Sequence, residues 1–293
     1  MERKSPPTDR VVRILDLLAD APRERFTLTQ VADTLRLNKP TCLGILAALT
    51  DADYVTRDDA KSYGLGPALI RLGTAAESGL ANLDLVRPFL VDLHDRLGLS
   101  CVLSAVYDEH AMILDRLGTA IPGDRRDLVG ERFPLAPPLG LVNIAWEHPG
   151  VVDEWLARPP LIPIAADALP VRDIVAGGLA NGYIIECLRT SSSSSVVLAS
   201  LLASDLPPRI VDELRGHLPP EDWSEFVTTL PDDDATPLPV ANISAPVFDR
   251  QGAQQYTLTV VPERPDATVA LARAWGEATA RAAAAASAAL GRR

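Results

Sequence analysis

The stretch LNKPTCLGILAALTDADYVTRDDAKSYGLG, residues 37–66, decides the fold of the first part of the chain. Its apolar residues recur at the spacing of one helix face, at Cys42, Ile45, Leu46 and Leu49. Asn38 can cap this helix, and Pro40 is tolerated in its first turn. Residues 54–57 and 61–65 flank a short polar turn, which predicts a two-stranded hairpin. A helix followed by such a hairpin is the layout of a DNA-reading helix and its wing.

Two further helices are predicted upstream of this stretch. They carry the same apolar spacing, at Val11, Ile14, Leu15 and Leu18 and again at Leu28, Val31, Ala32 and Leu35. Thr27 and Gln30 form a capping-box pattern at the start of the second helix. Because only a few residues connect the second and third helices, the pattern predicts a helix-turn-helix. We therefore expect an all-α, winged helix-turn-helix domain over residues 1–66.

The predicted third helix is poor in groups that read bases. With its apolar stripe in the core, the residues facing outward are Pro40, Leu43, Gly44, Ala47 and Ala48. Base edges are usually read by Arg, Lys, Asn or Gln, whereas Leu43 offers only apolar contact, for example to a thymine methyl group. Lys39, Arg57 and Lys61 can hold phosphates. The full set of candidate DNA contacts is Thr27, Asn38, Lys39, Pro40, Thr41, Leu43, Gly44, Arg57, Lys61 and Tyr63.

Composition and charge limit the possible classes of protein. The chain has 293 residues, 47% of them hydrophobic, a length typical of about two domains. Its net charge is -11, yet residues 1–80 contain 11 basic and 11 acidic residues, so the excess acid lies beyond them. Strong non-specific binding to nucleic acid is therefore not expected. The sequence has neither a long apolar run nor a signal peptide, and its three cysteines suit reduced thiols, so we expect a cytoplasmic protein without membrane partners.

The second part of the chain mixes helices and strands, which predicts an α+β domain. We expect a linker helix within residues 67–81 and a domain over 82–293. Helices are predicted at 83–97, 139–147, 151–157, 171–180 and 268–290, and strands within 100–118 and at 183–188, 240–248 and 255–261. An inserted segment at 189–239 holds a serine run, interpreted as a flexible link, and two predicted short helices at 208–216 and 221–229. We expect these helices to pack over a ligand pocket or at a subunit contact.

Several ordered motifs resemble one known family. Residues 8–73, with ILDLLADAPRERFTLTQVADTLRLNKPT running into YVTRDDAKSYGLGPALIRLG, resemble the N-terminal domain of IclR-type transcriptional regulators. VGERFPLAPPLGLVNIAW, GGLANGYIIE and NISAPVFDRQG look like parts of the family's effector-binding domain. This chain departs from the family in having Gly44 where an Arg is usual, Pro40 in place of Ser, and Asp53 in place of the Gly that commonly ends the helix. The first change removes an expected DNA contact.

The resemblance implies a GAF-like second domain that binds a small organic effector and no other cofactor. It places the pocket between a loop containing Pro138 and the sheet. Pro137 and Pro138 make this loop stiff and apolar, which favours an effector with a partly hydrophobic body. The candidate effector-binding residues carried over from the family are Pro138, Leu139, Asn143, Glu186, Cys187, Asn242 and Thr259.

The resemblance implies a regulator that reads near-palindromic DNA as a homodimer or a dimer of dimers, with its effector acting through the linker helix. Two other classes remain open. One is a sensor or protein-interaction module that has lost DNA recognition, which the bare third helix favours. The other is a thiol enzyme using Cys101 or Cys187 with a histidine, although the sequence shows no local signature for a base or a metal site, and we expect no enzyme.

Overall fold

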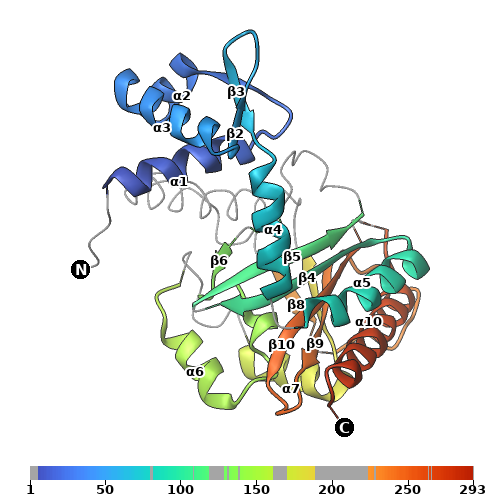
Figure 1. Ribbon diagram of the computed structural model, residues 1–293. Coiled ribbons are helices and arrows are strands. Elements are labelled where there is room, and N and C mark those ends of the chain that lie inside the picture. Colours follow the sequence, from blue (N-terminus) through green and yellow to red (C-terminus); the bar gives the residue numbers. More distant parts are fainter. Residues whose placement is uncertain are drawn as a thin grey trace. The chain divides into compact units, whose positions relative to one another are not determined.

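The computed structural model describes residues 6–79, 82–107, 109–118, 129–130, 132–137, 139–160, 170–188, 224–227, 229–262, 264 and 266–292. These residues divide into two compact units, one running to Leu83 and the other beginning at Asp84 (Figure 1). Among the described helices, none has the length and apolar character needed to cross a membrane.

The first unit combines three helices and a small sheet with a fourth helix, α4, at its end. Its elements are α1 (Pro6–Ala19), β1 (Phe26–Thr27), α2 (Leu28–Thr34), α3 (Lys39–Asp51), β2 (Val55–Arg57), β3 (Ser62–Leu65) and α4 (Ala68–Gly79). The sheet has the order β1-β3-β2, with both pairs antiparallel, so β2 and β3 form the predicted wing (Figure 1). The predicted winged helix-turn-helix is confirmed.

Local capping explains where α2 and α3 begin. Thr27 accepts a hydrogen bond from the Gln30 amide at 3.3 Å, and the Gln30 side chain accepts one from the Thr27 amide at 2.8 Å. Asn38 Oδ1 accepts from the Thr41 amide at 2.8 Å. Each bond satisfies an amide that the first helical turn leaves unpaired. Both predicted N-terminal caps are therefore present.

The chain leaves α3 and the wing through two tight turns. Asp53 has a φ of +60°, so this residue takes the left-handed position that Gly commonly fills at a helix end. Gly66 ends the wing where the backbone folds back, and a Cβ atom there would lie 2.1 Å from the Asp53 carbonyl oxygen. Gly66, which follows Tyr63-Gly64-Leu65, is therefore required by a close backbone approach.

The second unit is built on one antiparallel sheet. Its strands are β4 (Ser100–Tyr107), β5 (His110–Leu117), β6 (Arg132–Pro134), β7 (Ile184–Leu188), β8 (Ser224–Val227), β9 (Val240–Phe248) and β10 (Gln254–Val261). Their order is β6-β5-β4-β10-β9-β7-β8. The described helices are α5 (Leu83–Leu97), η1 (Leu141–Asn143), α6 (Pro149–Ala157), α7 (Val171–Asn181) and α10 (Val269–Ala289). The expected α+β class is confirmed.

Helices cover the two faces of this sheet differently. On one face, α5 and α10 lie side by side, and the Phe248 amide donates to the Ser287 hydroxyl of α10 at 2.9 Å (Figure 1). On the other face, η1, α6 and α7 pack their apolar side chains in one cluster with Ala111 and Ile184 of the sheet. Trp155 of α6 is 1% exposed and anchors this cluster. The two faces are called the α10 face and the η1 face below.

Two predicted helices are wrong. Residues 139–147 contain only the 3₁₀ turn η1, because Gly140 has a φ of +86° and the next amides bond three residues back, as Asn143 does to Gly140. Within 221–229, residues Ser224–Val227 form β8, which pairs with β7. The backbone of β7 offers an edge to pair with, and tertiary pairing then outweighs local preference. The serine run and the predicted helix at 208–216 lie outside the described residues.

Candidate functional site

The outward side of α3 is exposed and apolar. Cys42 and Leu46 are fully buried, which turns the opposite side of the helix to solvent. Leu43 is 46% exposed, and Gly44, Ala47 and Ala48 lie beside it. No described atom lies within 4 Å of the place where a Gly44 Cβ would stand, apart from the helix's own backbone and Gly44's chain neighbours. The surface around Leu43 is therefore open and lacks side-chain hydrogen-bond donors.

Cationic residues flank this surface. Lys39 at the start of α3 and Arg57 and Lys61 in the wing are all exposed. Lys61 has a φ of +62° in the wing turn, and the Arg57 guanidinium lies 5.5 Å from the centre of the Tyr63 ring. Arg36, which was not among the predicted contacts, is also exposed, in the turn between α2 and α3. This arrangement suits contacts to phosphates on either side of a groove.

Three of the expected DNA contacts have structural roles in this unit. Tyr63 is 3% exposed, so its ring supports the wing from inside and is not offered to DNA. Thr27 and Asn38 use their side-chain oxygens as helix caps. Their part in DNA binding would therefore be indirect: they fix the ends of the helices whose backbone amides can face phosphates.

Arg25 holds the wing together, and the sequence pattern carried no signal for it. Its Nη2 donates to the Thr56 carbonyl oxygen at 3.0 Å and to the Ser62 carbonyl oxygen at 3.3 Å. Its Nε lies 2.8 Å from Asp58 Oδ2. One guanidinium thus bonds both wing strands and the turn between them. We call Arg25 and Asp58 the wing clamp.

A buried polar network lies on the η1 face of the second unit. Asn143 is 6% exposed, and its Nδ2 donates to Ser104 Oγ at 2.8 Å and to Thr257 Oγ1 at 3.1 Å. Gln254 Nε2 donates to the same Thr257 oxygen at 2.9 Å and to the Val142 carbonyl at 3.0 Å. Gln254 Oε1 is buried with no partner among the described residues. The network fixes η1 on β4 and β10, and only Asn143 of its members was predicted.

Further polar side chains continue across the same face. Ser244 Oγ and Thr259 Oγ1 lie 2.9 Å apart on neighbouring strands. Asn242 Nδ2 donates to Glu186 Oε2 at 3.3 Å. Side chains two residues apart on a strand point to the same face, so Thr259 lies with Thr257 on β10. Ser244 pairs with Thr259, and Asn242 lies two residues before Ser244 and pairs with Glu186. All four residues therefore share the face of Thr257 and Ser104. The polar row consists of Ser104, Asn143, Glu186, Asn242, Ser244, Thr257 and Thr259.

Two predicted effector residues lie apart from this row. Cys187 is 4% exposed and points to the α10 face, because it follows Glu186 on β7 and successive strand residues alternate. Leu139 is partly buried, and its carbonyl oxygen accepts from Trp155 Nε1 at 2.9 Å. Pro138 lies outside the described residues. The polar row thus unites Asn143, Glu186, Asn242 and Thr259, and adds hydroxyl groups that the sequence did not single out.

The cysteines lack the properties of a nucleophile. Cys42, Cys101 and Cys187 are all buried, and none of them is in a disulfide. Burial raises the pKa of the Cys101 thiol to about 12, so this thiol stays protonated at neutral pH. His94 lies on α5, and its Nδ1 is 2.7 Å from the Leu99 carbonyl oxygen. Among the described residues, no three His, Cys, Asp or Glu side chains are grouped to hold a metal ion.

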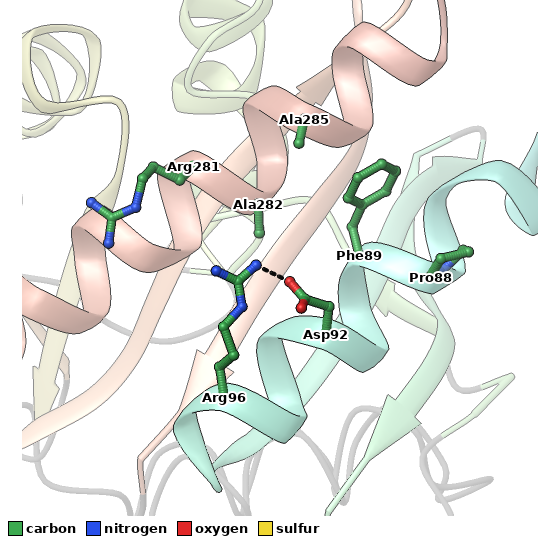
Figure 2. A pocket seen from close by; sticks show the side chains of 7 residues that line it. All are labelled: Pro88, Phe89, Asp92, Arg96, Arg281, Ala282 and Ala285. Carbon is green, nitrogen blue, oxygen red and sulfur yellow. Dashed lines mark hydrogen bonds and ion pairs between the residues drawn. The ribbon is translucent and has the colours of Figure 1, made fainter.

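A separate hollow of about 240 Å³ lies between α5 and α10. Figure 2 shows Phe89, Ala282 and Ala285 on its apolar part, with the Asp92–Arg96 ion pair at its edge. Because this hollow is on the α10 face, it does not include the polar row.

Comparisons with known proteins agree with this architecture. Residues 7–59 match the sequence profile of the IclR helix-turn-helix domain. A stretch of 75 residues is 41% identical to the glycerol operon regulatory protein of Streptomyces coelicolor, covering 25% of this chain and 29% of that protein. The match therefore spans less than a third of that relative.

Two solved structures resemble the chain over nearly its whole length. The IclR of Thermotoga maritima has a TM-score of 0.65 at 16% identity and covers 97% of this chain and 98% of its own. An IclR homologue of Microbacterium hydrocarbonoxydans, complexed with 4-hydroxybenzoate, has a TM-score of 0.61 at 17% identity, with the same shares covered. Residues 7–59 thus match a helix-turn-helix domain of the IclR type, and the chain as a whole shares the fold of these two solved structures.

Proposed function

We propose that this protein regulates transcription by binding operator DNA through α3 and the wing. The observation that carries the proposal is the exposed outward side of α3. Asn38 caps the start of this helix, and Lys39, Arg57 and Lys61 flank its outward side. A helix in this position of a helix-turn-helix enters the major groove, and the cations bind phosphates beside it. The glycerol operon regulatory protein, similar in this region, is a regulator by its name.

The protein acts as a homodimer or a dimer of dimers on near-palindromic sites. One winged unit offers few phosphate contacts, so a single half-site binds weakly. Pairing two units on one DNA converts the second binding event into an intramolecular one and raises the affinity. The symmetry of the protein then requires two half-sites related by a two-fold axis.

A small organic effector binds over the polar row and changes the DNA affinity. The row offers hydroxyl, amide and carboxylate groups beside the apolar cluster of η1, α6 and α7, a combination typical of sites for partly hydrophobic ligands. The solved relative with 4-hydroxybenzoate supports the class of ligand. The effector must bind one arrangement of the protein more tightly than the other, and we place the transmission in α4.

The DNA proposal is tested by fluorescence anisotropy with the full chain, its own upstream intergenic duplex and a random duplex, each at two salt concentrations. We expect selective binding to the upstream duplex. The double variant Lys39→Ala, Arg57→Ala should bind more weakly, with a salt slope reduced by about 0.9 for each phosphate that the protein no longer neutralises. Arg281→Ala, an exposed arginine on α10, is the matched control and should bind normally.

The alternative is a protein-interaction or sensor module, and one observation favours it: no base-reading donor is exposed on the outward side of α3 between Thr41 and Thr50. Equal, weak binding to both duplexes would support this alternative.

The effector proposal is tested by thermal shift with a panel of aromatic and aliphatic carboxylic acids that includes 4-hydroxybenzoate. We expect at least one acid to raise the melting temperature, and Thr259→Val to reduce that rise because it removes one of the paired hydroxyls. Thr74→Val, on α4, is the matched control. If the acids raise the melting temperatures of the wild type and Thr259→Val equally, the ligand does not bind at Thr259.

A further inference from the structure

The chemistry of the α3 surface is unusual for a base-reading helix. Residues 42–49 carry no hydrogen-bonding side chain apart from the buried thiol of Cys42. All of α3 is described, and Leu43, 46% exposed, is its one exposed large apolar side chain. Discrimination by side-chain hydrogen bonds to bases is therefore not available along the middle of α3. The remaining way for these residues to distinguish base pairs is contact with an apolar group.

The major groove presents one such group. The C5 methyl of thymine projects into it, whereas the other base edges offer hydrogen-bond donors and acceptors. The open space at Gly44 and the small Ala47 and Ala48 allow the helix backbone to approach the bases closely beside Leu43. The cations at Lys39, Arg57 and Lys61 complement phosphates at the edges of the same surface and fix its register.

We propose that α3 reads thymine methyl groups and that Leu43 is the specificity-determining residue. This inference rests on the proposed function and names the feature of the DNA that is recognised: half-sites with thymine opposite Leu43. Burying one methyl group changes an affinity by about fourfold. Two half-sites in a dimer multiply the effect to about 15-fold.

The test uses uracil, which keeps the hydrogen-bonding edge of thymine and lacks its methyl. Duplexes bound by the full-length protein are first selected from a random library. Each thymine of the selected half-site is then replaced by 2′-deoxyuridine, and binding is measured by fluorescence anisotropy. We expect the selected sites to share a thymine whose replacement, made in both half-sites, weakens binding about 15-fold.

Variants connect this effect to the residue. Leu43→Ala should bind the thymine and uracil duplexes equally. Leu72→Ala, which removes a leucine that is 42% exposed on α4, should keep the full preference for thymine. Leu43→Gln should shift the selected base towards adenine, which glutamine bonds in a bidentate manner. Circular dichroism confirms that each variant is folded.

The outcomes separate this inference from the proposed function. If no duplex is enriched, DNA binding itself fails. If duplexes are enriched but uracil binds as well as thymine, DNA binding stands and methyl recognition is overturned. If Leu43→Ala keeps the full preference for thymine, another residue reads the methyl and the assignment of Leu43 is overturned.

Discussion

Leu43 and Asn143 lie in opposite surroundings in two regions of the molecule. In the first unit, an apolar leucine faces solvent on a helix, and in the second unit a polar asparagine is buried against a sheet. Exposed single leucines are common, whereas a buried asparagine must find partners. Asn143 has two of them, Ser104 and Thr257, while Leu43 has an open surface. The buried polar side chain is fixed by partners within its own unit and holds η1 in place, whereas the surface around Leu43 is left open, as the proposed DNA contact requires.

The largest effect is expected in the buried network. Asn143→Leu should lower the free energy of unfolding by about 2 kcal/mol, because Ser104 loses the bond from Asn143 and Thr257 keeps only the bond from Gln254. Urea denaturation followed by tryptophan fluorescence measures this change. Adding Ser104→Ala should restore part of the stability, because the hydroxyl that lost its bond from Asn143 is then removed. A loss below about 0.5 kcal/mol, the range of ordinary surface substitutions, would show that the network is not structural.

The wing clamp extends the comparison, because it places hydrogen bonds and an ion pair at the edge of the exposed region. Arg25→Ala should weaken DNA binding about tenfold, corresponding to about 1.4 kcal/mol, since the wing loses its bonds from Arg25 to Thr56 and Ser62. The free energy of unfolding should change by less than about 1 kcal/mol, because the Arg25–Asp58 pair is exposed. Anisotropy and urea titrations measure the two quantities.

Arg25→Lys separates positioning from charge. Lysine keeps the charge but cannot bond both strands, so we expect a loss of affinity close to that of alanine, with an unchanged salt slope. Arg23→Ala, an exposed arginine nearby, is the control. A slope lowered by about 0.9 in Arg25→Ala would instead identify Arg25 as a phosphate contact.

Gly44→Ala should stabilise the first unit by about 1 kcal/mol, because glycine inside a helix is less favourable than alanine and the added Cβ has room. Chemical denaturation measures this gain. Gly73→Ala on α4, which also has room for a Cβ, should stabilise similarly. If α3 lies in the groove, Gly44→Ala alone should also alter DNA affinity. Equal DNA binding by both variants would place Gly44 away from the bases.

The smallest effect concerns the thiols, which are buried in both regions. Cys42, Cys101 and Cys187 should not react with a thiol reagent in the native protein at pH 8 within an hour, and all three should react in guanidinium chloride. Burial raises the pKa of Cys101 to about 12, so very little thiolate is present at that pH. Rapid native labelling of Cys101 would contradict the packing on the α10 face and reopen the thiol hypothesis.

The sequence predicted local features of the fold well. Helix stripes, the Thr27 and Asn38 caps and the wing hairpin all depend on residues close in the chain, so their patterns are visible before folding. The predictions failed where distant parts decide. Within residues 139–147, η1 is held on the sheet by the bonds from Asn143 to Ser104 and Thr257, and Ser224–Val227 form a strand because β7 offers a partner. Neither partner can be read from the local pattern.

The sequence alone was enough to predict the helix-turn-helix and wing of the first unit, the bare outward side of α3 and the confinement of the acid excess beyond residue 80. Only the tertiary structure decided which polar residues meet. Arg25 joins strands that lie more than 30 residues away, and Gln254 bonds to η1, more than 100 residues away. Tertiary structure also buried the side chains of Tyr63 and Cys187. Periodicity gives the side of an element on which a residue lies, but its partner depends on packing between elements, which no local pattern records.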